Sequence, residues 1–103
     1  MTICAGCVII FYEVIRLKTA VLFGAGQAGA AVLRLLYGYE PLCFADNDEK
    51  KRGGEFCSLP VLSAAEALAL GPDCVFICVT DAARAAQMRA QLDGLGCAAE
   101  VRD

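Results

Sequence analysis

The sequence predicts an α/β fold built around a doubly wound parallel sheet, and three observations carry this prediction. The chain has 103 residues, which is the length of one domain. Hydrophobic residues make up 58% of it and form short unbroken runs, as in parallel strands that are buried on both faces. These runs alternate with helical patterns, and a parallel sheet needs a helical crossover between successive strands.

The first expected strand covers Thr19 to Phe23 and leads directly into the glycine-rich segment Gly24–Gly29. A helix should follow, because apolar residues recur at helical spacing at Ala28, Ala31, Val32, Leu35 and Leu36. We expect this helix to stop at Gly38. The second strand should cover Pro41 to Ala45 and end in the acidic run 46–49.

The middle of the chain contains a polar loop, a short extended piece and a short helix. The loop covers 50–54, and the extended piece is Pro60-Val-Leu62. Ser63-Ala-Ala-Glu66 is a capping box, in which the serine and glutamate side chains each bond a backbone N–H of the first turn. The helix that it starts should stop at Gly71-Pro72.

The third strand, Cys74 to Val79, is apolar throughout. Asp81 is expected to cap a helix that runs to about Leu92, and Cys97 to Val101 should form the last strand, at the edge of the sheet. Right-handed crossovers then place four strands in the order 2-1-3-4, with the switch point between the first and third.

The segment Gly24-x-Gly26-x-x-Gly29 has the spacing of a phosphate-binding loop, and it lies between a strand and a helix as such loops do. The first glycine permits a tight turn, the second removes a Cβ that would block a phosphate, and the third lets helix and strand pack closely. Free N–H groups and the helix dipole then favour an anion. We expect phosphate binding by Gly24, Gly26, Gln27, Ala28 and Gly29. The alternative is a turn that keeps its glycines for packing alone.

Polar residues at the ends of the other strands complete the expected site. Asp46 ends the second strand, 22 residues after Gly24, where a carboxylate can accept hydrogen bonds from ribose hydroxyls. Such a carboxylate disfavours a 2′-phosphate, which favours NAD over NADP. The alternative is that Asp46 and Asp48 only begin a polar turn. Asn47 and Thr80 are added as cofactor-binding candidates, whereas Asp81 is more typical of a helix cap.

Charge and residue content argue against several function classes. The net charge is −3 and no segment forms a basic stripe, so no nucleic-acid partner is expected. The absence of histidine excludes a Ser-His-Asp set, and no Tyr-x-x-x-Lys pair is present. We therefore expect no complete catalytic site in this chain.

The seven cysteines are odd in number and lie mostly in apolar runs, as expected for reduced thiols in a cytoplasmic protein. Cys4-x-x-Cys7 has no second pair and no histidine to complete a zinc site, and no strand before it to suggest a redox motif.

Residues 1–17 lie outside the predicted sheet. The apolar run Ile3–Tyr12 has ten residues, whereas a membrane span needs about twenty, so a membrane role is expected only for a fragment of a longer segment. Its flanks do not match a signal peptide. Apolar residues recur with the spacing of a helical seam at Ile3, Cys7, Ile10, Val14 and Leu17. They predict an association helix that contacts a second copy or a neighbouring domain. The β-branched run from Val8 favours a strand instead.

Residues 18–103 resemble the small Rossmann-like, CoA-binding-like domains of bacterial surface-polysaccharide and nucleotide-sugar proteins. The matching segments, in the same order and spacing, are Val21–Gly29, Phe44–Lys50, Gly53, Leu59–Leu62 and Val75–Val79. Ser58 departs from the glycine usual in that group. The same elements are similar to the NADH-binding domain of redox-sensing repressors.

This resemblance implies a non-catalytic domain that binds NAD(H), a nucleotide sugar or CoA. It carries over no catalytic residue, because the active sites of those proteins lie in other domains. Within a larger enzyme, the domain would belong to a nucleotide-sugar dehydratase or epimerase, or to a sugar transferase. Two alternatives remain: an NAD(H)-responsive sensor, and an assembly scaffold with a vestigial glycine loop.

Overall fold

Six strands form one mixed sheet in the computed structural model, which describes residues 17–103. The strands follow the order β3-β4-β2-β1-β5-β6 across the sheet. All neighbouring strands are parallel except β3 and β4, which form an antiparallel hairpin. Their bounds are β1 (Lys18–Phe23), β2 (Tyr39–Ala45), β3 (Glu55–Phe56), β4 (Leu59–Leu62), β5 (Cys74–Ile77) and β6 (Glu100–Arg102).

The predicted α/β class is confirmed, whereas the four-strand sheet in the order 2-1-3-4 is wrong in strand number and in extent. The four expected strands correspond to β2, β1, β5 and β6, and these are adjacent as predicted. Beyond β2 the sheet continues, because the extended piece at Pro60–Leu62 pairs with β2 as β4.

The hairpin between β3 and β4 turns at Cys57 and Ser58, whose φ angles are +51° and +67°. Two-residue hairpins of this kind favour glycine or asparagine at both central positions. Neither residue is present here, so the sequence carried no turn signal. Ser58 therefore stands at a left-handed position, which glycine adopts more readily than serine.

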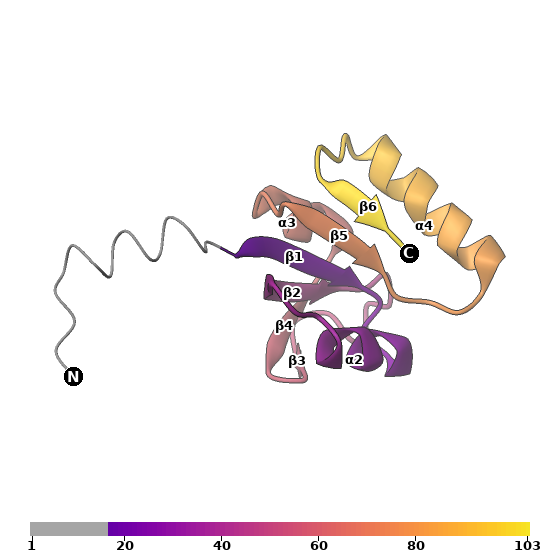
Figure 1. Cartoon of the computed structure of the whole chain (residues 1–103). Coiled ribbons are helices and arrows are strands. Elements are labelled where there is room, and N and C mark those ends of the chain that lie inside the picture. The colour runs from indigo at the N-terminus through magenta and orange to yellow at the C-terminus, as the bar shows by residue number, and fades with distance from the viewer. Residues whose placement is uncertain (1–16) are drawn as a thin grey trace, which may run out of the picture.

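Helices cover both faces of the sheet, and the three layers can be followed in Figure 1. Helix α2 (Gln27–Arg34) packs on one face through Ala28, Val32 and Leu33. Helices α3 (Ala64–Ala69) and α4 (Ala82–Gly94) pack on the opposite face. Because the central strands are parallel, their carboxyl ends lie at the same edge of the sheet.

The core has two parts, one on each face of the sheet. Val21 and Phe23 of β1 join one cluster, while Leu22 between them joins the other, since successive side chains on a strand point to opposite faces. All three are at most 1% exposed. Burial on both faces therefore explains the unbroken apolar runs of the central strands.

Two predicted helix starts are confirmed in atomic detail. Ser63 Oγ accepts from the backbone N–H of Glu66, and the Glu66 carboxylate accepts from the Ser63 N–H, both over 3.2 Å. These hydrogen bonds lower the pKa of Glu66. At α4, Asp81 Oδ1 accepts from the backbone N–H of Ala83 over 2.9 Å.

Several predicted boundaries are wrong, and strand β2 starts at Tyr39 rather than at Pro41. Helix α2 ends at Arg34, well before Gly38, because the Leu35 and Leu36 N–H groups donate to carbonyls three residues back in a tightened last turn. Strand β5 ends at Ile77 rather than Val79. Strand β6 starts at Glu100, because the Cys97 N–H still caps the end of α4 by donating to the Leu92 carbonyl over 3.1 Å.

The predicted association helix over residues 1–17, with Cys4 and Cys7, falls outside the described residues except for Leu17, and it stays a prediction. Among residues 17–103, no helix combines the length and apolar character needed to cross a membrane.

Candidate functional site

The glycine loop lies where β1 meets α2, between the ends of β2 and β5. The Gly24 N–H donates to the Ala45 carbonyl over 2.7 Å. Gly24 has a φ of +126°, and a Cβ there would lie 2.7 Å from the Cys78 carbonyl oxygen. Only glycine therefore fits between the two neighbouring strands.

The other two glycines of the motif differ in what surrounds them. A Cβ on Gly29 would lie 2.1 Å from the Gly24 carbonyl oxygen and 2.9 Å from Cε1 of Phe44, so Gly29 lets α2 rest directly on the loop. A Cβ on Gly26 would meet nothing within 4 Å. Gly29 therefore serves packing, whereas Gly26 faces open space.

That open space adjoins the first turn of α2. Gly26 is the N-cap residue, no side chain caps the helix, and no acidic residue lies in its first turn. The first N–H groups of a helix have no carbonyl partner within it, and the helix dipole adds a partial positive charge. The N–H groups at Gln27, Ala28 and Gly29 thus suit a phosphate or another anion.

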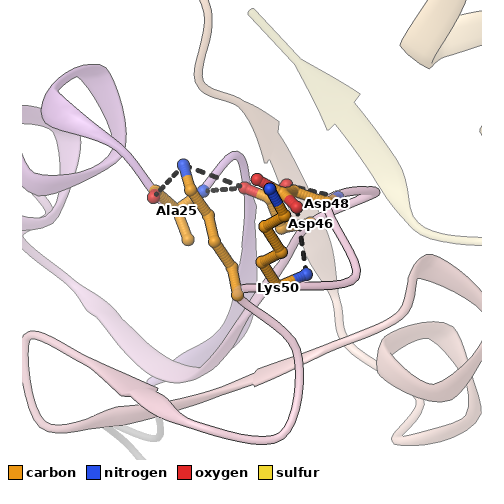
Figure 2. A network of polar contacts seen from close by, with 5 residues as sticks. Ala25, Asp46, Asp48 and Lys50 are labelled. Atoms are coloured by element: carbon orange, nitrogen blue, oxygen red, sulfur yellow. Dashed lines mark hydrogen bonds and ion pairs between the residues drawn. The ribbon is translucent and has the colours of Figure 1, made fainter.

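Asp46 joins the glycine loop to the turn that follows β2. Its Oδ2 accepts from the Ala25 N–H and its Oδ1 from the Asp48 N–H, both over 2.8 Å. Figure 2 shows the carboxylate between these two residues, with Asp48 in turn bonded to Lys50. The residue is only 9% exposed. Each carboxylate oxygen can accept more than one hydrogen bond, so a ribose contact remains open to Asp46.

Lys51 reaches the loop from the same turn. Its ammonium group donates to the Ala25 carbonyl over 3.0 Å and lies 3.9 Å from Asp46 Oδ2. Its side chain is 46% exposed, so solvent shields its charge only in part.

A cavity of about 220 Å³ opens above the loop. Six of the eight predicted binding residues line it: Gly24, Gly26, Gln27, Ala28, Asp46 and Thr80. Gly29 does not line the cavity, because it packs against the Gly24 carbonyl and the Phe44 ring. Asn47 is bonded elsewhere, since its amide exchanges two hydrogen bonds of 2.8 and 2.9 Å with Gln91 of α4.

Sequence reasoning missed two cations that line this cavity, Lys51 and Arg84. Lys51 stands in the basic run 50–52, which was interpreted only as a polar loop. Arg84 lies in the first turn of α4, and nothing in the sequence says that this turn faces the glycine loop. The two side chains supply positive charge from two different elements.

Cys78 also lines the cavity, and it carries no charge there. Burial raises the pKa of its thiol to about 12, and a hydrogen bond to the backbone of Phe23 lowers it by less. The thiol is therefore neutral at physiological pH and does not repel an anion. Residues 17–103 hold no group of three or more cysteine or acidic residues that could bind a metal ion.

No family model and no curated protein matches this chain. Solved structures do match it. The UDP-D-quinovosamine 4-dehydrogenase from Vibrio fischeri is similar, with a TM-score of 0.65 and 21% identity over 82% of this chain and 75% of that one. RSP, a Rex-family repressor, gives a TM-score of 0.63 with 15% identity over 88% of this chain.

Two further structures of the repressor hold ligands. RSP in complex with β-NADH gives a TM-score of 0.60, and RSP with β-NAD⁺ and operator DNA gives 0.59, each at 15% identity. This chain spans about half the length of the repressor, 47% in the first complex and 48% in the second. At these identities the likeness shows a shared fold, in agreement with a Rossmann-like sheet.

Proposed function

We propose that residues 18–103 form a nucleotide-binding domain that holds ligand phosphate at the glycine loop and leaves chemistry to another module. The observation that carries this proposal is the open space at Gly26. It faces the uncapped first turn of α2, and Lys51 and Arg84 line the same cavity. A loop kept for packing alone would not need a glycine at a position where a Cβ meets nothing.

The acidic side chains at the cavity support this interpretation, because both already have partners. Asp46 accepts from two backbone N–H groups, and Asp81 accepts from the first turn of α4. These backbone donors partly offset the two negative charges, and the helix N-terminus, Lys51 and Arg84 add positive charge to the same cavity.

NAD(H) and nucleotide sugars are the ligands we propose first, with CoA as the alternative. A repressor of the same fold has been solved with β-NADH, and a dehydrogenase of the same fold is named for a UDP-sugar. Asp46 accepts a hydrogen bond from the loop at Ala25, and a carboxylate there would contact a ribose hydroxyl and disfavour a 2′-phosphate.

The domain would act in surface-polysaccharide or nucleotide-sugar metabolism, in the cytoplasm, with residues 1–17 contacting a second copy or a neighbouring domain. An NAD(H) sensor is the second candidate, and the likeness to the NADH-bound repressor favours it. That repressor has also been solved with operator DNA. For this chain we still expect no nucleic-acid partner, since its net charge is −3.

A thermal-shift panel of NAD, NADH, NADP, CoA, UDP-sugars and ATP tests the proposal. A ligand at 100 times its Kd should add about 2.7 kcal/mol of stability, which raises Tm visibly. Lys51→Met should reduce the shift given by the best ligand. The matched control is Lys18→Met, which removes the same charge at the far end of β1. Equal shifts in both variants would count against the site, and no shift with any nucleotide would favour the scaffold alternative.

A further inference from the structure

A second and larger cavity, of about 570 Å³, lies between α2 and the β3–β4 hairpin. Apolar side chains from three elements line it: Ala30 of α2, Phe56 of β3 and Val61 of β4. Lys50 and Glu55 add charged groups to the same lining. The cavity therefore combines an apolar surface with nearby hydrogen-bonding groups, as small-molecule sites do.

The two cavities adjoin at the glycine loop. Ala25, Gly26, Gln27 and Lys51 line both of them. Ligand sites usually have volumes of about 300–1,000 Å³, so the first cavity, at about 220 Å³, is too small for a whole nucleotide. The second falls within this range. A ligand whose phosphate occupies the first cavity must extend beyond it, and the second is an adjoining cleft with an apolar lining.

The lining of the second cavity suits a planar aromatic group. The Phe56 ring is half-buried and held by an edge-to-face contact with Phe44, with ring centroids 5.0 Å apart and an interplanar angle of 75°. A fixed aromatic ring beside aliphatic side chains offers a stacking surface for a base. The Lys50 ammonium group can donate, and the Glu55 carboxylate can accept, hydrogen bonds at the edge of a base.

We propose that the second cavity binds the nucleobase of the ligand whose phosphates occupy the first. This inference rests on the proposed function and adds to it the position of the base, on the α2 face of the sheet against Phe56. One nucleoside diphosphate would then extend past Gly26 and Lys51, which line both cavities. The lack of a Cβ on Gly26 leaves space for it to pass.

Ala30→Leu tests the inference, because a longer side chain at Ala30 enters the second cavity and leaves the first unchanged. Its matched control is Ala31→Leu, at the next residue of α2, which is exposed and lines neither cavity. The probes are ADP, UDP and inorganic pyrophosphate, with dissociation constants from isothermal titration calorimetry. Of ADP and UDP, we take the nucleotide that binds wild type more tightly. Ala30→Leu should raise its dissociation constant by roughly tenfold or more, the scale of a lost base-stacking contact. Pyrophosphate affinity should not change, and Ala31→Leu should match wild type.

Phe56→Leu supplies a second variant, which keeps apolar bulk and removes the ring. It should weaken nucleotide binding and spare pyrophosphate. The inference fails if Ala30→Leu or Phe56→Leu weakens the binding of nucleotide and of pyrophosphate equally. It also fails if Ala30→Leu weakens the binding of neither. In both cases the base lies elsewhere and the proposed function stands. If wild type binds none of the three probes, the inference fails, and the proposed function fails as well if no nucleotide of the panel raises Tm.

Discussion

Gly29→Ala is expected to destabilise the domain by about 3 kcal/mol, at the upper end of what overpacking costs. The added methyl group would lie 2.1 Å from the Gly24 carbonyl oxygen and 2.9 Å from the Phe44 ring. The first neighbour is backbone and the second is a fully buried side chain, so neither can move without shifting α2 away from the sheet. Urea denaturation should show a lower midpoint with an unchanged m-value.

Gly26→Ala is the matched control, because it adds the same methyl group where nothing lies within 4 Å. Its midpoint should stay close to that of wild type, while its binding of phosphate ligands should fall. Similar midpoints for Gly29→Ala and Gly26→Ala would show that α2 does not pack on the loop as described.

Asp46→Ala is expected to destabilise the domain by a similar amount, about 3 kcal/mol, because it leaves two backbone donors without their acceptor. The Ala25 and Asp48 N–H groups both donate to this carboxylate, whose residue is 9% exposed. The charge of Lys51 would also lose its acidic neighbour at 3.9 Å. The loss should appear as a lower denaturation midpoint in urea.

Asp48→Ala is the control for this substitution, since Asp48 is exposed and its side chain accepts the N–H of Lys50 within the turn. Its effect should stay within about 0.5 kcal/mol, as for most surface changes. Asp46→Asn should lie between the two, because an amide oxygen still accepts one of the two bonds. An Asp46→Ala variant as stable as Asp48→Ala would contradict the role assigned to this carboxylate.

Local sequence signals predicted most of the fold. The capping box at Ser63 and the cap at Asp81 are short-range features, and the structure contains both. The apolar runs are also local features, and they located the central strands because burial on both faces leaves a continuous apolar pattern. The hairpin at Cys57 and Ser58 was missed because residues that rarely adopt positive φ form its turn.

Part of the candidate site could likewise be predicted from local sequence, and part could not. The spacing of three glycines after a strand identified the loop, although the sequence could not show that Gly29 serves packing and Gly26 faces open space. Lys51 and Arg84 reach the loop from segments 22 and 55 residues after Gly29, so only tertiary structure places them there. Asn47 was expected at the site, and the structure pairs its side-chain amide with Gln91 of α4.

The most direct test is an NMR titration of the ¹⁵N-labelled full chain with inorganic pyrophosphate. An anion held by the first turn of α2 should shift the amide resonances of Gln27, Ala28 and Gly29 most strongly, and the shifts should saturate. Gly26→Ala should abolish the saturation at those three amides. Saturable shifts centred on the opposite edge of the sheet, or no saturable shift at the glycine loop, would contradict phosphate binding at this site.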